Sequence, residues 1–484
     1  MGSLLPTPYS LLPTPSFVEK SNKNHRTNIN NFNSLMSAKV KLTIIQGSTI
    51  GKEYIFEERT TCIIGRHRDC KPRLPSDEQH RTISRYHCLL DINPPDIKVR
   101  DFASKNGTYV NGKKIGQRQS EHLSETTTKN NFPEYELKSG DQIQLGNTIF
   151  QVSLEEETEM PPEMLDQPKT WQEKTVKLST LRPSLGDSTL TKIPGYTALN
   201  LLGKGGCGEV YLARNNYTQE LIALKTMLPE ITNNPNAINR FLREIENTKA
   251  LNHPNVVQLK DYHYSDRLFF FTLEYCNGGS IWNLMQDHGC RLSVDVAVPI
   301  ILQALDGLEY AHNAEIPYVK KADGSLSIGR GLVHRDIKPA NIFLSNNVDN
   351  STVVKIADYG LAKAFDLAGL SGQTITGNKG GTFPFMPRQQ MIDFKYVKPE
   401  VDVWAMAATL YNMLTGVYPR DFVGKDPILT VLQTKPVPIR QRNLSIPKSL
   451  AEVIDLALID EPEIYFKTAK EFKQALLSSY QHFP

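Results

Sequence analysis

The sequence predicts a multidomain chain in which an all-β sandwich precedes an α+β region with a small β-rich lobe and a larger helical lobe. Two observations support this division. Short alternating strands separated by turn signals fill residues 39–154, whereas longer helical periods, such as 300–312 and 401–414, appear after residue 194. A stretch rich in Pro and Thr, residues 155–193, lies between the two regions and reads as a linker.

The composition is that of a globular protein, with 39% hydrophobic and 22% charged residues and a formal net charge of +3. No dense Lys/Arg block indicates nucleic-acid or membrane binding. The longest apolar run, residues 296–305, is shorter than the roughly 18–20 residues of a bilayer span and is interrupted by Pro299 and Gln303. The six cysteines show no metal-ligand spacing, as expected of reduced thiols. We therefore expect a cytoplasmic protein with no nucleic-acid and no membrane partner.

Residues 1–38 are expected to be a disordered N-terminal segment. The motif Leu-Leu-Pro-Thr-Pro occurs at residues 4–8 and again at 11–15, and an Asn/Ser-rich stretch follows. Such sequence buries too little apolar surface to order itself, and it lacks the charged and apolar regions of a signal peptide. Met36 stands just ahead of the first strand, so the native start could be Met1 or Met36.

The β region contains five clear strand signals, and no long helical period interrupts them. These strands are expected at residues 42–45, 54–56, 62–64, 88–92 and 149–152. Turn residues fall between them, among them the pair Asn111-Gly112, which is typical of a two-residue hairpin. Residues 117–133 are too polar for a core strand and are expected to form a surface insertion. The pattern favours a sandwich of two sheets.

The run His334-Arg335-Asp336-Ile337-Lys338-Pro339-Ala340-Asn341 places a carboxylate, an ammonium and a carboxamide in one short loop. Phosphoryl transfer needs this set, because a hydroxyl must be held in line with a nucleotide phosphate and a metal ion. Asp336 is expected to orient the attacking hydroxyl and accept its proton. Lys338 is expected to neutralise γ-phosphate charge, and Asn341 to bind magnesium.

The nucleotide-binding residues precede this loop in the expected order. Leu202, Gly203, Gly205, Gly208 and Val210 lie in a G-x-G-x-x-G-x-V pattern, a hairpin whose bare backbone can close over phosphates. A lone glycine pattern would more often be a plain turn.

The next strand, residues 221–225, carries Ala223 and Lys225, and such a lysine bridges the α- and β-phosphates when a carboxylate orients it. Glu244, on a helix expected over 240–251, is the favoured partner. Glu246 is the competitor, about 200° around the helix.

Asp358, in Asp358-Tyr359-Gly360, follows a strand expected at 353–357 and is placed to chelate the metal that bridges the phosphates. With these elements in order, residues 196–483 resemble the eukaryotic-like Ser/Thr protein kinases. The resemblance implies ATP and Mg²⁺ (Mn²⁺ being possible) as cofactors, and proteins as substrates. It also implies a gatekeeper at Leu273, an adenine-binding hinge that includes Glu274 and Cys276, and a buried carboxylate, Asp402, that anchors the catalytic loop.

The chain also departs from the pattern of that family. Tyr359 replaces the usual Phe and adds a hydroxyl that needs a partner. Pro387-Arg388-Gln389 stands where the family has Ala-Pro-Glu, and the late arginine that pairs with this Glu is missing from residues 465–467. Losing both partners of an ion pair costs less than stranding one buried charge. We therefore expect an altered brace in the large lobe of an active enzyme. A polar insertion at residues 313–331 is expected to be a surface loop.

Arg335, beside Asp336, indicates regulation by phosphorylation of the activation segment, because a phosphate would pair with it and order the loop. The hypothesis is autophosphorylation at Thr374 or Thr376, with Ser371 as a further candidate and Thr382 in a structural role.

Three motif blocks in the β region, Gly65-Arg66, Ser84-Arg85-Tyr86-His87 and residues 106–112, resemble a forkhead-associated (FHA) domain over 39–154. The resemblance implies phosphothreonine recognition. Arg66 offers a planar fork for phosphate, Ser84 and Arg85 add donors, and Asn106 can bind the peptide backbone. Lys105 stands where the family often has a small polar residue. His87 is expected to hold loops together.

The leading interpretation is thus an active cytoplasmic Ser/Thr protein kinase, an ATP-dependent phosphotransferase, whose FHA domain recruits phosphothreonine-bearing partners or its own Thr-rich linker. The alternative from another class is a pseudokinase scaffold that reads phosphothreonine without catalysis. The departures at Gln389 and Tyr359 leave room for that alternative, whereas the complete catalytic set argues against it. A kinase of small molecules fits the long activation segment less well.

Overall fold

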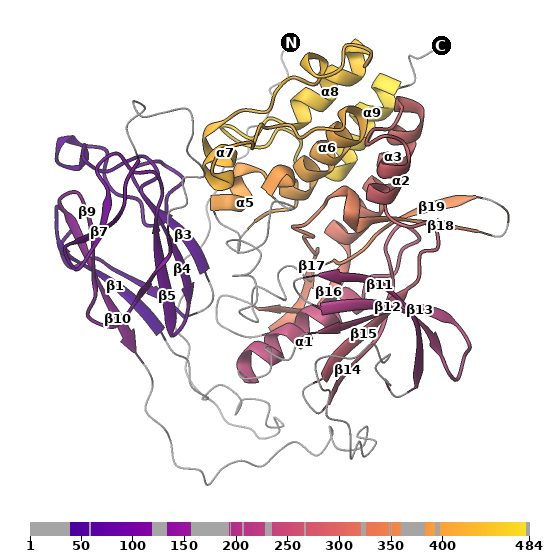
Figure 1. The fold of residues 1–484 in the computed structure, drawn as a ribbon, viewed down its shortest axis with the longest axis horizontal. Helices are drawn as coiled ribbons and strands as arrows, with labels where there is room; N and C mark the ends of the chain where they lie inside the picture. The colour runs from indigo at the N-terminus through magenta and orange to yellow at the C-terminus, as the bar shows by residue number, and fades with distance from the viewer. Residues whose placement is uncertain are drawn as a thin grey trace, which may run out of the picture.

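The computed structural model contains two domains that lie side by side, an N-terminal β domain and a larger C-terminal domain with two lobes (Figure 1). It describes residues 39–57, 60–118, 133–155, 193, 195–205, 208–227, 235–265, 268–320, 326–347, 349, 351–359, 383–392 and 397–480. The expected N-terminal segment, most of the linker and the interior of the 117–133 insertion lie outside these residues. So do Ser371, Thr374, Thr376 and Thr382.

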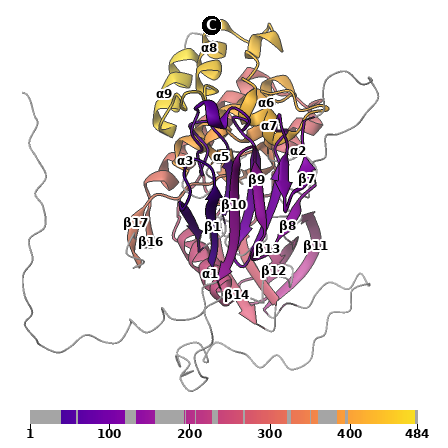
Figure 2. The same ribbon diagram turned by 90° about the vertical axis from the view of Figure 1, so that its left-hand side faces the viewer.

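The N-terminal domain is a sandwich of two antiparallel sheets, as the strand pattern predicts (Figure 2). One sheet has the order β2-β1-β10-β9-β6-β7 and the other β3-β4-β5-β8. The strand bounds are β1 Lys39–Gln46, β2 Glu53–Phe56, β3 Thr60–Ile64, β4 Cys88–Asn93, β5 Asp96–Asp101, β6 Thr108–Val110, β7 Lys113–Gly116, β8 Tyr135–Leu137, β9 Gln142–Leu145 and β10 Thr148–Glu155. A short 3-10 helix, η1 (Glu78–His80), lies in the loop between β3 and β4.

Alternation along the strands builds the core of this sandwich. Val40, Leu42 and Ile44 on β1 point inward and are buried, and the residues between them are partly exposed. The predicted hairpin turn is confirmed, because Asn111 and Gly112 join β6 to β7 with φ angles of 49° and 78°.

The small lobe of the C-terminal domain is a five-stranded antiparallel sheet with the order β11-β12-β13-β15-β14, together with one helix. The bounds are β11 Tyr196–Gly205, β12 Gly208–Asn215, β13 Leu221–Met227, α1 Pro235–Lys249, β14 Leu259–Ser265 and β15 Leu268–Glu274. The predicted helix and strand of this lobe are present, each a few residues longer than its sequence signal.

The large lobe is mainly helical and has two short hairpins, β16-β17 and β18-β19. Its core forms around α6, in which nearly every residue is buried, and α3 packs against both α6 and α9. The bounds are α2 Ile281–Asp287, α3 Val294–Asn313, β16 Glu315–Lys320, β17 Leu326–Arg330, η4 Pro339–Asn341, β18 Ile342–Asn346, β19 Thr352–Ile356, η6 Phe383–Phe385, α5 Arg388–Ile392, α6 Glu400–Thr415, α7 Pro427–Gln433, η7 Ile439–Gln441, α8 Lys448–Ala457 and α9 Ala469–Tyr480.

The 313–331 insertion corrects one expectation. The polar composition predicts a surface loop, but the structure shows the hairpin β16-β17, and its first strand contacts α1. The carboxamide of Asn247 on α1 exchanges two hydrogen bonds of 3.0 Å with the backbone of Tyr318. β-Forming residues such as Tyr318 and Val319 prevail over the polar residues at the turn. The insertion therefore supports the small lobe.

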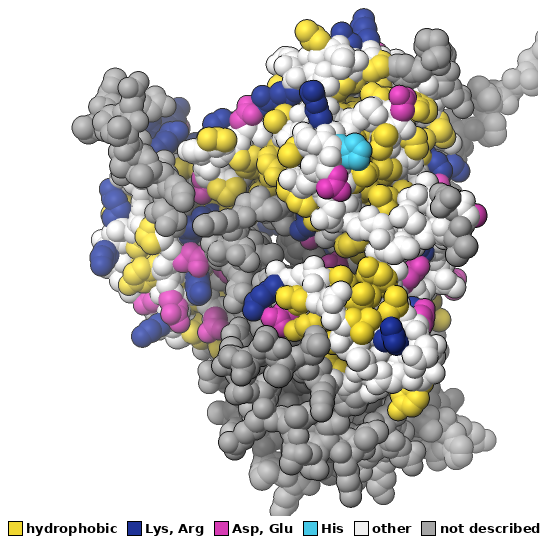
Figure 3. Space-filling view, turned by 45° about the vertical axis from the view of Figure 1, so that its right-hand side comes forward, with side chains coloured by type: hydrophobic (Ala, Val, Ile, Leu, Met, Phe, Trp, Pro, Cys, Tyr) yellow, Lys and Arg dark blue, Asp and Glu magenta, His cyan; other side chains and the backbone are white. Residues whose placement is uncertain are grey.

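The face drawn in Figure 3 shows the large lobe above the small lobe, with hydrophobic side chains gathered on both and charged groups of either sign interspersed. Among the described residues, no helix is long and apolar enough to cross a membrane.

Candidate active site and phosphate-binding loops

The catalytic loop holds Asp336 among the residues that its motif predicts. Lys338 Nζ lies 2.8 Å from Asp336 Oδ2. Asn341 donates from Nδ2 to the backbone oxygen of Asp336 at 2.8 Å and to its Oδ2 at 3.0 Å. Asp336 Oδ1 is buried and has no hydrogen-bond partner among the described residues. One carboxylate oxygen is thus fixed by the loop, and the other remains an acceptor for a substrate hydroxyl.

Asp402, near the start of α6, anchors this loop as the family resemblance implies. Its carboxylate is fully buried and accepts the backbone N–H groups of His334 and Arg335, both at 2.7 Å, and His312 Nε2 at 2.8 Å. Burial alone would raise the pKa of Asp402, but His312, His334 and the Arg335 N–H together hold that pKa below its usual value. Arg335 adopts φ 71°, so this anchoring also holds a left-handed residue beside Asp336.

Asp358, directly after β19, faces the small lobe across the cleft. Lys225 Nζ lies 3.2 Å from each of its carboxylate oxygens. Burial would raise the pKa of Asp358, whereas Lys225, His334 and Lys338 lower it, and the pKa is lowered overall. Asp358 therefore stays ionised, which is the state that binds a metal cation.

The two candidate carboxylates on α1 have different surroundings. Glu244 is 7% exposed, whereas Glu246 is more exposed and hydrogen-bonds to Tyr262 on β14. This arrangement favours Glu244 as the residue that faces the cleft. Thr248, one turn further along α1, donates to the backbone oxygen of Tyr359 at 2.9 Å and ties the helix to the metal-binding segment. The Tyr359 hydroxyl finds its partner in the backbone oxygen of Gly307, at 3.3 Å.

The glycine-rich hairpin and the hinge lie at the cleft edge of the small lobe. β11 and β12 pair antiparallel, with Gly205 opposite Gly208, and Val210 lies opposite Lys225 on the next strand. Ala223 pairs with Leu273, the predicted gatekeeper, one residue before Glu274. Glu274 Oε1 pairs with Lys355 at 3.0 Å, and Cys276 is buried, which raises the pKa of its thiol to about 12. Leu202 and Gly203 are exposed at the hairpin.

In the N-terminal domain, the four candidate phosphothreonine residues lie on three adjacent loops. Arg66 is half-buried and donates from Nε to the backbone oxygen of Ile83 at 2.5 Å. The Ser84 hydroxyl accepts the Lys105 N–H at 2.8 Å, and Asn106 donates to the backbone oxygen of Thr82 at 2.6 Å.

Arg85 is exposed next to Ser84, and the backbone of Arg66 pairs with that of Ser84 at 3.2 Å. These loops bring two guanidinium groups, a hydroxyl and a carboxamide to one end of the sandwich. Lys105 contributes its backbone N–H to the Ser84 hydroxyl, and its side chain is exposed.

His87 has the supporting role that the sequence predicts. Its ring is fully buried, with Nδ1 accepting the Ser84 N–H at 3.0 Å and Nε2 lying 3.0 Å from the backbone oxygen of Gly107. Burial lowers the pKa of His87 and favours the neutral ring that this pair of contacts requires. His87 thus links two of the phosphate-binding loops.

The expected altered brace in the large lobe is present, and it involves residues that the motifs do not mark. Gln389 donates to the backbone oxygen of Asp460 at 2.8 Å. Asp460 Oδ2 accepts the Arg388 N–H at 3.0 Å and the Arg420 guanidinium at 2.5 Å. A buried Arg–Asp pair therefore occupies the region where the family has its Glu–Arg pair. The signal available in the sequence was Arg388 itself, a cation in an otherwise apolar run.

Comparison with known families agrees with this geometry. Residues 196–463 match the family described as protein kinase domain, and residues 62–146 match the FHA domain. The chain belongs to the protein kinase family. Its N-terminal sandwich is an FHA domain, and nothing in these comparisons supports the scaffold alternative.

Bacterial protein kinases are among the relatives of this chain. It is 30% identical over 279 residues to the probable serine/threonine-protein kinase CPE1738 of Clostridium perfringens, an alignment covering 57% of this chain and 37% of that protein. Serine/threonine-protein kinase PknB of Mycobacterium leprae is 30% identical over 290 residues, with 58% and 42% covered. Tyrosine-protein kinase MasK of Myxococcus xanthus is 28% identical over 288 residues, with the same coverage. The chain thus spans less than half the length of these relatives.

Two solved structures are also similar. The kinase domain of Mycobacterium tuberculosis PknI matches with 23% identity and a TM-score of 0.45, covering 60% of this chain and 98% of that one. The structure of Rad53 1-466 in complex with AMP-PNP matches with 19% identity and a TM-score of 0.45, covering 90% of this chain and 100% of that one.

Proposed function

We propose that the chain is an active Ser/Thr protein kinase that transfers the γ-phosphoryl group of ATP to protein hydroxyls, and that its FHA domain binds phosphothreonine. The observation that carries the first part is the catalytic cluster. Asp336, Lys338 and Asn341 are mutually hydrogen-bonded, and Asp358 pairs with Lys225 across the cleft. A silent scaffold needs none of these contacts.

The residues divide the reaction between them. Asp336 Oδ1 accepts the hydrogen bond, and then the proton, of the attacking hydroxyl. Lys338, held at 2.8 Å from the other oxygen, neutralises charge that develops on the transferred group. Lys225 lies at the cleft edge of β13, where its ammonium can move from Asp358 to the nucleotide phosphates while Glu244 orients it. Specificity for Ser/Thr follows from Lys338, two residues after Asp336, by family resemblance.

The donor set suits ATP with Mg²⁺. Asp358 supplies an ionised carboxylate, and Asn341, whose Nδ2 is committed to Asp336, can offer its carboxamide oxygen. Bound magnesium would neutralise phosphate charge during transfer. Mn²⁺ prefers the same oxygen ligands, so it is expected to substitute.

Transfer of labelled phosphate from ATP tests this proposal. The wild type should label itself or a protein substrate on Ser or Thr, and Asp336→Asn should reduce the rate by at least 100-fold because the proton acceptor is lost. Asp287→Asn, an exposed carboxylate at the end of α2, is the matched control and should behave as wild type. Absence of label with both Mg²⁺ and Mn²⁺ would restore the scaffold alternative.

For the FHA domain, the supporting observation is the meeting of Arg66, Ser84, Arg85 and Asn106 at one end of the sandwich. Its ligand is proposed to be a phosphothreonine-bearing partner or the chain's own Thr-rich linker, residues 170–191. A tethered site experiences an effective concentration on the order of millimolar, so a weak linker site could be filled. Binding of a phosphothreonine peptide library to the full chain should fall at least ten-fold in Ser84→Ala and stay unchanged in Ser153→Ala.

Autophosphorylation at Thr374 or Thr376 is proposed from the position of Arg335. Mass mapping of the active protein should find phosphate in residues 371–382, and an unmodified segment in active enzyme would contradict the proposal. The cytoplasmic location, and the lack of nucleic-acid and membrane partners, stay predictions from the sequence.

A further inference from the structure

The outer face of one FHA sheet is apolar, although an antiparallel sandwich normally exposes polar residues there. On β3 and β4, Cys62, Ile64, Cys88 and Leu90 point into the domain core. Ile63 and Leu89 alternate with them, pair directly across the two strands, and point outward, yet they are 1% and 2% exposed. Something other than the FHA core covers them.

The covering surface is the large kinase lobe. Ile63, Cys70, Tyr86, Leu89 and Phe102 form one hydrophobic cluster with residues on the kinase side, and α5 contacts β3 directly. The kinase side of the cluster consists of Phe383, Met386, Met391, Ile428, Val431 and Leu432. Its residues come from η6, α5 and α7, and η6 follows directly on residues 360–382. The FHA sheet thus packs against the end of the activation segment.

Polar contacts border this apolar cluster. Arg100, which lies opposite Leu89 on β5, is 3.5 Å from Asp426, and that carboxylate also caps α7 by accepting the N–H groups of Ile428 and Leu429. Arg68 donates to the backbone oxygen of Pro462 at 3.2 Å.

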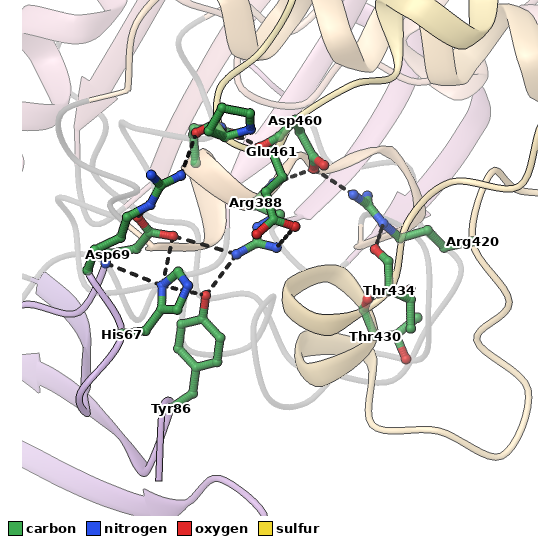
Figure 4. A network of polar contacts seen from close by, with 12 residues as sticks. His67, Asp69, Tyr86, Arg388, Arg420, Thr430, Thr434, Asp460 and Glu461 are labelled. Carbon is green, nitrogen blue, oxygen red and sulfur yellow. Dashed lines mark hydrogen bonds and ion pairs between the residues drawn. The ribbon is translucent and has the colours of Figure 1, made fainter. Parts of the chain in front are cut away.

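Arg388 is the centre of these contacts (Figure 4). Its guanidinium is 8% exposed and donates to the Tyr86 hydroxyl at 2.8 Å and to Glu461 at 3.0 Å, and it lies 3.6 Å from Asp69. The Tyr86 hydroxyl is in turn 2.9 Å from His67 Nδ1. A buried cation of the kinase lobe is therefore satisfied in part by the FHA domain, and separating the domains would leave it under-coordinated.

The loop segments that make these contacts also carry the phosphate-binding residues. Arg66 precedes His67, and Arg85 precedes Tyr86, so each pair places one residue at the phosphate site and the next at the kinase contact. The two segments are joined by backbone hydrogen bonds from Arg66 to Ser84 at 3.2 Å and from His67 to Arg85 at 2.9 Å. Cys70 Sγ also donates to the Arg85 oxygen, at 3.3 Å. Movement at one site is transmitted to the other through this paired backbone.

We propose that phosphothreonine binding at Arg66, Ser84 and Arg85 is coupled to docking of the FHA domain on the kinase lobe, each strengthening the other. The coupling rests on the proposed phosphothreonine recognition, whereas the docking contact does not. Docking fixes the two loop segments, so a phosphate that binds afterwards pays less ordering entropy. It also brings the Arg388 cation to the other side of the same loop, which favours an added anion. By linkage, bound phosphothreonine holds the end of the activation segment more firmly.

Two full-chain variants that weaken docking test the proposal. Leu89→Lys places a charge on the outer face of β4, and Ile428→Lys does so on α7 and leaves the FHA sequence intact. Ile55→Lys is the matched control, an apolar side chain on β2 that is 57% exposed. The probes are free phosphothreonine and a peptide of residues 170–180 phosphorylated on Thr175. The readouts are the dissociation constant of each probe and hydrogen exchange of residues 383–392 and 427–433.

Both docking variants should bind the probes at least five-fold more weakly than wild type and exchange faster over 383–392, with Ile55→Lys unchanged. Saturating probe should slow that exchange in wild type and in Ile55→Lys, but not in Ser84→Ala. Equal affinity in wild type and both docking variants would overturn the coupling while leaving phosphothreonine recognition intact. A wild type that binds neither probe would overturn the coupling as well, and faster exchange in the variants would then establish docking alone.

Discussion

Two buried carboxylates brace the large lobe, and they do so in different ways. Asp402 binds two backbone N–H groups of the catalytic loop and His312, all within one lobe. Asp460 binds Arg420 and the Arg388 N–H, and through the Arg388 side chain its network reaches Tyr86 in another domain. The brace at the catalytic loop is self-contained, whereas the brace at the end of the activation segment depends on the FHA domain. The first should respond to changes within the lobe, and the second to changes in either domain.

Replacing the central carboxylate of the self-contained brace should have the largest effect. In Asp402→Asn, the new carboxamide turns an N–H group toward donors, so buried N–H groups lose their acceptor. We expect a loss of about 3–5 kcal/mol in the free energy of unfolding of the large lobe. Urea unfolding followed by the fluorescence of Trp404, which is fully buried beside α8, measures it. Asp455→Asn, where one oxygen accepts the Ile439 N–H, is the control and should lose less than about 1 kcal/mol.

The brace between the domains should be less costly to break. Arg388→Met removes charge-assisted hydrogen bonds to Tyr86 and Glu461, and we expect a loss of about 2–3 kcal/mol in unfolding free energy. Arg420 still neutralises Asp460 in this variant. Arg442→Met, which breaks a more exposed pair with Asp421, should cost less than about 1 kcal/mol. Equal losses in the two arginine variants would show that the contact with Tyr86 contributes nothing.

A third brace, between the inserted hairpin and α1, sharpens the comparison because it acts on the small lobe. Asn247→Ala removes both hydrogen bonds to Tyr318, and we expect a loss of about 1–2 kcal/mol together with a several-fold lower kcat and little change in the KM for ATP. Asn313→Ala, an exposed residue bonded to the Glu309 oxygen, is the matched variant. A change confined to stability would limit the hairpin to a structural role.

The smallest expected effect is the pH dependence of docking at His67. Burial, with the nearby charges of Arg388, Arg68 and Arg85, lowers the pKa of His67 despite the opposing charge of Asp69. A docked state with a lowered His67 pKa binds fewer protons than the undocked state, so docking should weaken as pH falls below about 6.5. Hydrogen exchange of residues 383–392 at pH 7.5 and pH 5.5, corrected for intrinsic rates, measures the change. His67→Asn should remove the His67 contribution, and an unchanged pH dependence in this variant would contradict it.

The sequence predicts the catalytic site because each of its residues lies in a short motif whose local backbone fixes the geometry. Asp336, Lys338 and Asn341 occupy six consecutive positions, and Asp358 ends a strand that its apolar run marks. The contact between the domains could not be predicted in this way, because Tyr86 and Arg388 are separated by 302 residues. One signal was present. Cys62-Ile63-Ile64 is apolar at successive positions, and a strand buried on both faces has that pattern. The hairpin at 315–330 shows the opposite error, in which polar residues concealed β-forming ones.

The outward row Ile63–Leu89–Arg100 has a consequence for how such chains can be assembled from modules. An FHA domain grafted from another protein, with polar residues along this row, would fold and recognise its phosphopeptide but would lack the shape and charge that meet η6, α5 and α7. Domain exchange would therefore preserve both individual activities and lose the communication between them. The kinase lobe in such a chimera would expose Phe383 and Ile428 to solvent, and solubility would be the first property to suffer.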